Sequence, residues 1–184
     1  MNETMQPGSS FLNPDLVVGE LGIAQGMNIG DFGSGAGHLA ILIAQKIGEG
    51  KLYAIDILED KLESVRVRAK ASGVENIQTI RANLEVLGST GLQDNSQDMV
   101  LLINILFQSQ KKQEILKEAL RVLKPKGRLA VVEWQKGAGG FGPPDELRTS
   151  ESELYSLIEQ LGFAKDRSLN VGQFHYGSLF QKIQ

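Results

Sequence analysis

The stretch DFGSGAG at residues 31–37 decides the fold, because it places three glycines directly after a short apolar run that ends near Asp31. An almost entirely apolar stretch follows Gly37. This order predicts a strand, a glycine-rich turn and a helix. Gly33, Gly35 and Gly37 permit positive φ angles and let a ligand lie against bare backbone, while the free N–H groups that open the helix attract an anion. The stretch therefore predicts a ligand site that suits a carboxylate or a phosphate.

A second acid, Asp56, stands 19 residues after Gly37, at the end of the apolar run LYAID. Parallel strands of an α/β sheet end at one edge, so Asp56 is expected beside the same crevice. A carboxylate there can accept hydrogen bonds from the two hydroxyls of a ribose. The sequence thus predicts a ligand that carries a nucleoside.

The spacing of the glycines indicates which nucleoside cofactor is bound. A dinucleotide fingerprint requires Gly-x-Gly-x-x-Gly/Ala, and His38 occupies its third position here. We interpret His38 as a first-turn helix residue and not as a ligand or a base. The run of Gly33, Gly35 and Gly37, with an acid two residues before it, resembles motif I of the class I S-adenosylmethionine-dependent methyltransferases.

The downstream sequence extends this resemblance over residues 11–184. SQDMVLLIN at 96–104 is similar to the family's fourth strand, and RVLKPKGRL at 121–129 is similar to its "RVLKPGG" segment. VEW at 132–134, GPP at 142–144 and LGF at 161–163 follow in family order. The chain is most similar to the small bacterial and archaeal methyltransferases akin to the quinone-biosynthesis type.

The resemblance implies S-adenosylmethionine as cofactor, S-adenosylhomocysteine as product, and a set of binding residues. These are Asp31 and Asn104 for the methionine end, Gly33, Gly35 and Gly37 for the turn, Asp56 for the ribose, and Ile57, Asn83 and Leu84 for the adenine. Asn83 departs from the family's usual Asp. Its amide oxygen can still accept from the adenine amino group, in a weaker, neutral hydrogen bond.

The sequence says less about the methyl acceptor than about the cofactor. No Asn/Asp-Pro-Pro-Tyr follows the fourth strand, where NILFQ stands at 104–108, so methylation of adenine or glutamine amino groups is disfavoured. The lack of cysteine excludes arsenic and thiol-relay chemistry. A substrate pocket would draw on the loop 137–144 and on Phe11, Phe107, Trp134, His175 and Tyr176. This lining suits a planar or apolar small molecule, although core roles for these side chains fit equally well, and no catalytic base is assigned.

Composition indicates one domain of residues 11–184 after a flexible N-terminus at 1–10. A chain of 184 residues buries about 70% of its unfolded surface. A net charge of −3 provides no basic field for nucleic acid. With two histidines and no cysteine, no metal site is expected. No apolar stretch approaches the ~20 residues of a membrane span, and no leader is evident, so a cytoplasmic protein is expected.

The periodicity predicts helices alternating with strands. Helices are expected near 15–22, 37–48, 59–72, 109–123 and 150–162, and strands near 27–32, 51–56, 76–81, 98–104 and 127–134, with a final hairpin of 163–170 and 173–183. The fold class is α/β, a single Rossmann-like, doubly wound domain. The resemblance implies a mostly parallel seven-stranded sheet with an antiparallel last strand.

The expected function is in-line methyl transfer from S-adenosylmethionine to a small-molecule acceptor. Holding donor and acceptor in line can supply about 7–11 kcal/mol of the barrier. Two alternatives remain at this point: a non-catalytic S-adenosylmethionine-binding subunit that needs a partner, and a nicotinamide-dependent oxidoreductase. The sequence does not indicate an oligomeric state.

Overall fold

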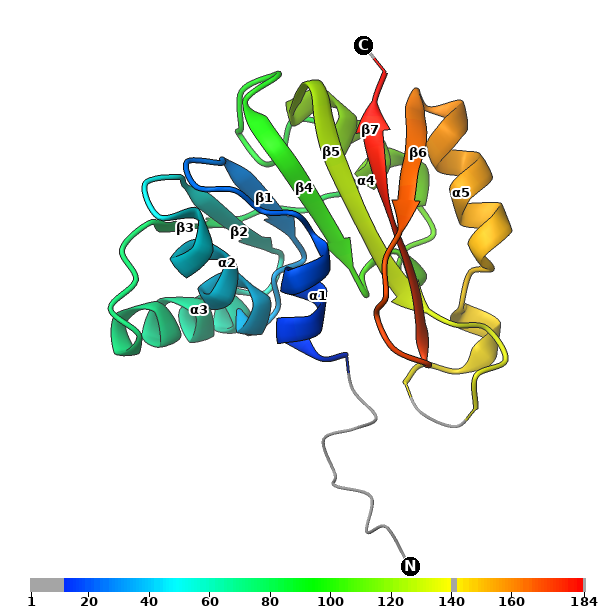
Figure 1. The fold of residues 1–184 in the computed structure, drawn as a ribbon, viewed down its shortest axis with the longest axis horizontal. Helices are drawn as coiled ribbons and strands as arrows, with labels where there is room; N and C mark the ends of the chain where they lie inside the picture. Colours follow the sequence, from blue (N-terminus) through cyan, green and yellow to red (C-terminus); the bar gives the residue numbers. More distant parts are fainter. Residues whose placement is uncertain (1–11, 140–141, 184) are drawn as a thin grey trace, which may run out of the picture.

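The computed structural model describes residues 12–139 and 142–183, and it contains a seven-stranded sheet covered by helices on both faces (Figure 1). The expected N-terminal segment 1–10 and Phe11 lie outside the described residues. The strands are β1 Ile29–Phe32, β2 Leu52–Asp56, β3 Ile77–Arg81, β4 Gln97–Ile103, β5 Leu123–Trp134, β6 Phe163–Ser168 and β7 His175–Lys182. The α-helices are α1 Pro14–Glu20, α2 His38–Ile47, α3 Glu59–Ala71, α4 Lys112–Val122 and α5 Glu151–Gln160, with short 3-10 helices η1 Leu106–Gln108 and η2 Asp145–Leu147.

The sheet has the order β3-β2-β1-β4-β5-β7-β6. The first five strands are parallel to one another, and β7 runs antiparallel between β5 and β6. The predicted fold class is therefore confirmed, including the antiparallel last strand.

The alternation of apolar side chains along β4 explains why helices cover both faces. Met99 and Leu101 pack in one core cluster with residues of α1 and α2, whereas Val100 and Leu102 pack in the other with residues of α4 and α5. A strand that is apolar on both faces is buried on both, which is why this segment reads as one continuous apolar run. All four side chains are fully buried.

Two helix starts follow the predicted capping chemistry. The Asn13 side chain accepts hydrogen bonds from the backbone N–H groups of Asp15 and Leu16, with Pro14 as the first helical residue of α1. Ser150 and Glu153 form a complete capping box at the start of α5.

Two boundaries differ from the prediction by three residues or more. β5 begins at Leu123 and not near 127, because a β-bulge shifts its register against β4 and Lys126 adopts a φ of 62° there. α4 begins at Lys112 and not near 109, because Ser109 accepts a hydrogen bond from the Lys111 N–H and ends the η1 turn.

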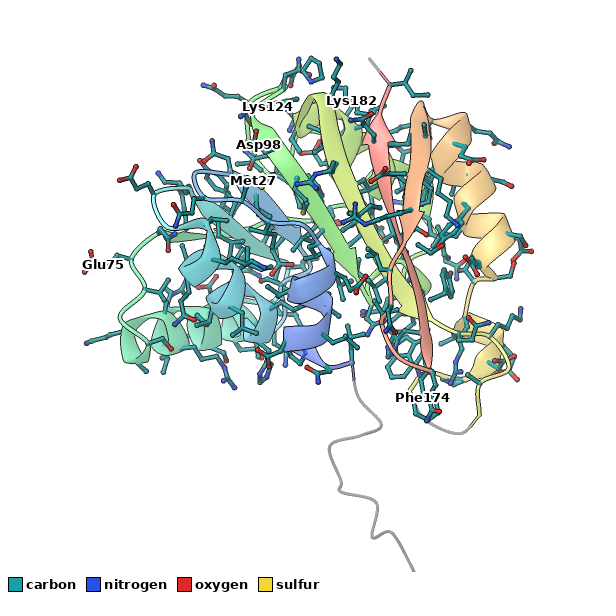
Figure 2. The ribbon with its side chains drawn as sticks, viewed as in Figure 1. Met27, Glu75, Asp98, Lys124, Phe174 and Lys182 are labelled. Carbon is teal, nitrogen blue, oxygen red and sulfur yellow. The ribbon has the colours of Figure 1, made fainter. Side chains whose placement is uncertain are left out.

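Side-chain contacts hold the edge of the sheet where the parallel strands begin. Asp98 accepts hydrogen bonds from the Asn28 N–H at 2.8 Å and from Lys124 Nζ at 2.7 Å, and Lys182 donates to the backbone carbonyls of Leu120 and Leu123 nearby (Figure 2). The opposite edge, toward which the arrowheads of β1, β4 and β5 point in Figure 1, carries the site described below. Within the described ranges, no helix is long and apolar enough to cross a membrane.

Candidate cofactor site

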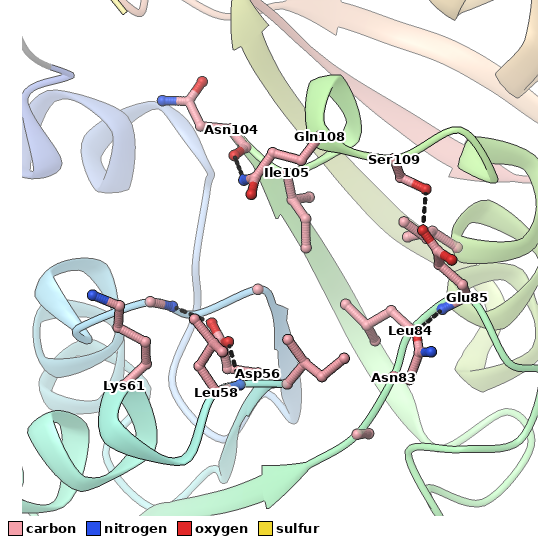
Figure 3. Close-up of a pocket in the computed structure, with 15 residues that line it drawn as sticks. Asp56, Leu58, Lys61, Asn83, Leu84, Glu85, Asn104, Ile105, Gln108 and Ser109 are labelled. Atoms are coloured by element: carbon pink, nitrogen blue, oxygen red, sulfur yellow. Dashed lines mark hydrogen bonds between the residues drawn. The ribbon is translucent and has the colours of Figure 1, made fainter. Parts of the chain in front are cut away.

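Two adjoining cavities lie where β1, β2 and β4 end. One measures about 480 Å³ and is lined by Asp56, Ile57 and Leu84, among others (Figure 3). The other measures about 460 Å³ and is lined by Asp31 and residues of the glycine turn. The two cavities share Gly33, Gly35 and Asn104 in their walls, so together they form one cleft across the turn. We call the first the adenine half and the second the methionine half, after the roles that the sequence predicts.

The three glycines of the turn all have positive φ, but the space around them differs. A Cβ atom on Gly33 would overlap Ile105, and one on Gly37 would lie 2.8 Å from Val65 Cγ2. At Gly35, with φ of 52°, a Cβ atom would meet no heavy atom within 4 Å. Gly33 and Gly37 are therefore required by packing inside the protein, whereas Gly35 leaves open space within the cleft.

Asp56 is tied to the glycine turn. Its Oδ2 accepts a hydrogen bond from the Gly35 N–H at 3.0 Å, and its Oδ1 accepts one from the Leu58 N–H at 3.0 Å (Figure 3). Each carboxylate oxygen retains acceptor capacity for another donor. The side chain is thus held in a fixed orientation at the cleft and can accept hydrogen bonds from the two hydroxyls of a ribose.

The methionine half contains buried polar atoms that have no hydrogen-bond partner among the described residues. They are Asp31 Oδ2, Ser34 Oγ and Asn104 Oδ1. Burial, and next the charge of Asp56, raise the pKa of Asp31 from 3.8 to about 7. Unsatisfied buried acceptors are costly, and an ammonium group brings three N–H donors with a positive charge that favours ionised Asp31. The residues present therefore fit the amino-acid end of S-adenosylmethionine.

This raised pKa leads to a prediction about pH. Between pH 3.8 and about 7 the empty folded protein holds a proton on Asp31 that the unfolded chain has released, so this group's contribution to stability falls as the pH rises. An ammonium ligand favours the ionised form, so we expect its affinity to rise as the pH approaches 7. At pH 6, binding should release close to one proton. Calorimetry in two buffers of different ionisation enthalpy measures this release, which Asp31→Asn should remove; equal heats in both buffers would contradict the prediction.

The adenine half is closed by the segment that follows β3. Leu84 is buried in its wall, while Ile57 is 52% exposed at the rim. Asn83 also lines this half, but its Oδ1 accepts a hydrogen bond from the Glu85 N–H at 3.0 Å. The Asn83 amide is therefore engaged in its own turn, and its contact with adenine stays a prediction that depends on the second lone pair of that oxygen.

Several residues that line the cleft or hold its walls in place were not predicted. Ser109 Oγ donates to Glu85 Oε1 at 2.7 Å and joins the two sides of the adenine half (Figure 3). Buried Glu133 accepts from the Leu106 N–H at 2.6 Å and holds the η1 turn, and burial raises its pKa to about 7 against the effect of backbone N–H groups. The only sequence signal for this contact was an acid inside the apolar run that ends β5.

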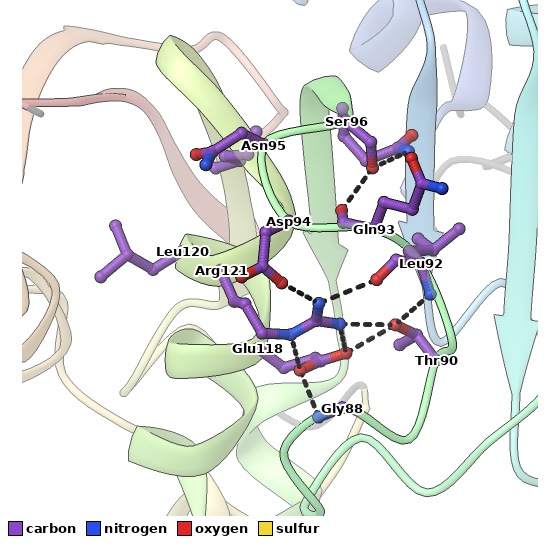
Figure 4. Close-up of polar contacts among 12 residues, drawn as sticks. Gly88, Thr90, Leu92, Gln93, Asp94, Asn95, Ser96, Glu118, Leu120 and Arg121 are labelled. Carbon is purple, nitrogen blue, oxygen red and sulfur yellow. Dashed lines mark hydrogen bonds and ion pairs between the residues drawn. The ribbon is translucent and has the colours of Figure 1, made fainter.

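The segment behind the adenine half is anchored by a buried ion pair (Figure 4). Glu118 of α4 is fully buried and accepts hydrogen bonds from Arg121, Thr90 and the Gly88 N–H. Arg121 also donates to the Leu92 carbonyl at 2.8 Å and pairs with Asp94. Residues 88–94, which continue the segment carrying Asn83 and Leu84, are thereby fixed to α4.

Of the aromatic residues predicted for a substrate pocket, the structure brings Trp134 and His175 together and places Tyr176 apart from them. Strand neighbours point to opposite faces, so Tyr176 lies in the core, where its hydroxyl donates to the Thr149 carbonyl at 2.9 Å, while His175 lies on the other face against Trp134, with ring centroids 4.2 Å apart. Phe107 is half-buried in η1. Among the described residues, the lining of the two cavities includes none of these four side chains.

The structure also places the two histidines and bears on the expectation about metal binding. His38 is exposed as the first residue of α2 and lines the methionine half. Burial, and next the charge of Arg148, lower the pKa of His175 to about 4, so its imidazole is neutral at pH 7. Within the part of the chain that the structure describes, no group of three or more His, Cys, Asp or Glu side chains could hold a metal ion.

A family model and the curated relatives indicate the same family of proteins. The model of a methyltransferase domain matches residues 23–182. The ubiquinone/menaquinone biosynthesis C-methyltransferase UbiE of Escherichia fergusonii is 32% identical over 138 residues, which are 74% of this chain and 54% of that protein. The chain thus spans about half the length of the curated relatives it matches.

The solved structures agree in fold. A SAM-dependent methyltransferase from Aquifex aeolicus has a TM-score of 0.85 at 27% identity, over 96% of this chain and 94% of that one. The [4+2]-cyclase SpnF has a TM-score of 0.78 at 19% identity, over 92% of this chain and 79% of that one, and shares the fold alone. The fold by itself therefore does not specify the reaction.

Proposed function

This chain belongs to the S-adenosylmethionine-dependent methyltransferases, and from that premise we propose that it transfers the cofactor's methyl group to a small, planar or apolar acceptor. The observation that carries the proposal is the two-part cleft, in which Asp56 is aligned by the Gly35 N–H and the buried Asp31 Oδ2 has no hydrogen-bond partner among the described residues. A cofactor with a ribose in one half and an ammonium group in the other satisfies both acids.

The chemistry requires little of the protein beyond holding the methyl donor and the acceptor in position. The sulfonium of S-adenosylmethionine activates its methyl carbon toward a nucleophile of the acceptor. The chain's contribution is to fix the cofactor's two ends, through Asp31 and Asp56, and to exclude water, which can supply about 7–11 kcal/mol without a covalent intermediate. As the acceptor bonds to the methyl carbon, the bond from that carbon to sulfur breaks and S-adenosylhomocysteine leaves. On a reduced quinone-like ring the methylated carbon then gives up its proton to solvent, and no residue of the chain is assigned as the base.

The class of acceptor is supported by the relatives and by charge. The curated relatives are named as C-methyltransferases of ubiquinone and menaquinone biosynthesis, so a quinone-like ring is the first acceptor to test. A net charge of −3 does not favour a polyanionic acceptor such as nucleic acid. Because the chain spans about half of those relatives, its acceptor can differ from theirs.

The cofactor assignment predicts a large effect of Asp56→Ala. The change removes the two carboxylate oxygens that would accept hydrogen bonds from the ribose hydroxyls. Binding of S-adenosylmethionine should therefore weaken by at least about tenfold. Calorimetry with purified protein measures this. Asp60→Ala, which removes an exposed acid in the first turn of α3, is the control and should bind as the unmodified chain does. Equal affinity of a folded Asp56→Ala protein would refute the assignment.

The proposed reaction is tested by incubating the chain with methyl-labelled S-adenosylmethionine and a set of reduced quinone-like rings. The expected result is a labelled product formed in equal amount to S-adenosylhomocysteine. Cofactor binding with no labelled product from any small-molecule mixture would favour the non-catalytic subunit. Binding of NAD in place of S-adenosylmethionine would favour the oxidoreductase.

A further inference from the structure

Asn104 has a fixed backbone at the junction of the two halves of the cleft. It follows β4 with φ of 53°, its N–H donates to the Val132 carbonyl at 2.8 Å, and its own carbonyl accepts from Gln108 Nε2 at 3.1 Å. With both backbone groups engaged, the side-chain amide is the part of the residue whose orientation is still free. Which of its two polar atoms turns toward the cleft then decides what the residue can bind.

The amide is held on one side by His175, 71 residues further along the chain. Asn104 Nδ2 lies 3.1 Å from His175 Nε2, and the imidazole is packed against the Trp134 ring. His175 is buried beside the positive charge of Arg148, conditions that keep the ring neutral. A neutral imidazole has one acceptor nitrogen, and the amide N–H is a donor. With the amide in this orientation, Nε2 accepts and the proton resides on Nδ1.

The planar amide then directs its oxygen away from His175. Asn104 Oδ1 is buried and accepts no hydrogen bond from the described residues, and the same holds for Asp31 Oδ2. Both residues line the methionine half of the cleft. Two unsatisfied acceptors on residues that line one cavity match a ligand with several N–H donors. A reversed amide would present N–H groups instead and would oppose an ammonium ion.

We propose that His175 is a positioning residue for the cofactor: its imidazole accepts from the Asn104 amide and thereby presents the amide oxygen to the ammonium group of the cofactor's methionine end. This inference rests on the proposed function, because it assigns a role within the cofactor cleft. It gives His175 a place in binding without contact to the methyl acceptor and without proton transfer.

Two substitutions separate this role from simple packing. His175→Phe keeps a ring against Trp134 but removes the acceptor nitrogen. His175→Gln removes the ring but provides an amide oxygen at about the reach of Nε2. The probes are S-adenosylhomocysteine, which carries the ammonium group, and 5′-methylthioadenosine, which keeps the nucleoside and the sulfur but lacks the amino-acid end.

We expect His175→Phe to bind S-adenosylhomocysteine about tenfold more weakly, as for the loss of a hydrogen bond to a charged group, with unchanged affinity for 5′-methylthioadenosine. His175→Gln should restore most of the loss. In an Asn104→Ala background, His175→Phe should cost nothing further, because the two residues act as a unit.

The proposal is overturned if His175→Phe binds both probes as the unmodified chain does, or if it weakens both probes equally, as a distorted cleft would. A folded His175→Gln protein that binds S-adenosylhomocysteine weakly also overturns it, and this outcome can be read even if His175→Phe does not fold. Failure of the unmodified chain to bind either probe would instead refute the cofactor assignment.

Discussion

Gly35→Val is expected to abolish binding of S-adenosylmethionine while the protein remains folded. The residue has φ of 52°, and the space beside its Cα is open cleft, so a valine side chain would occupy the position of the ligand. It would also displace the N–H that aligns Asp56. A left-handed conformation costs a side-chain-bearing residue about 1–2 kcal/mol. That cost is smaller than the roughly 5–15 kcal/mol that stabilises a domain.

Gly73→Val is the matched control for this prediction. Gly73 follows α3 with φ of 63°, and a Cβ atom there would also meet nothing within 4 Å, but it lies outside the cleft. Both variants should lose similar thermal stability, and only Gly35→Val should lose the calorimetric signal of cofactor binding. If Gly35→Val binds normally, the glycine turn is a structural connection only. Gly33 and Gly37 cannot serve in this test because their substitution would disturb packing with Ile105 and Val65.

The fold was predictable because its signals are local in sequence. The apolar periodicity, the glycine turn and the caps at Asn13 and Ser150 each act within a few residues, and the helices, strands and turn that they predict are present in the structure. The parallel order of the strands then brought Asp31 and Asp56 to one edge without further information. The start of β5 was missed because a bulge depends on pairing with a distant strand.

The parts of the site that could not be predicted depend on contacts between distant segments. The pairing of Asn104 with His175 requires β7 to lie beside β5, and the aromatic residues of β7 could not be assigned to a face before its register was known. Tyr176 and His175 are neighbours in sequence and were therefore grouped, yet a strand separates them onto opposite faces. Asn83 was expected to face a ligand, but a local turn competes for its oxygen.

The second large effect is expected on stability, from the removal of Glu118. This carboxylate is fully buried, and its two oxygens accept from Arg121 at 2.7 and 2.9 Å, from Thr90 at 2.5 Å and from the Gly88 N–H at 2.7 Å. Glu118→Ala removes the acceptor of the buried Thr90 hydroxyl and the carboxylate partner of the partly buried Arg121, which keeps its contacts with the Leu92 carbonyl and Asp94. Breaking one partner of a buried ion pair typically costs about 3–5 kcal/mol, a large share of a domain's total stability.

Glu114→Ala provides the matched control one turn earlier on the same helix. Glu114 forms an i,i+3 pair with Lys117, as Glu118 does with Arg121, but the side chains of both Glu114 and Lys117 are more than a third exposed. Exposed pairs contribute about 0–1 kcal/mol, so urea denaturation should separate the two variants by several-fold in lost free energy. Because residues 88–94 continue the wall of the adenine half, folded Glu118→Ala should also bind S-adenosylmethionine more weakly, whereas Glu114→Ala should not. Equal losses of stability would mean that the buried carboxylate is dispensable; a loss of stability with full cofactor affinity would mean that the wall keeps its shape without this anchor.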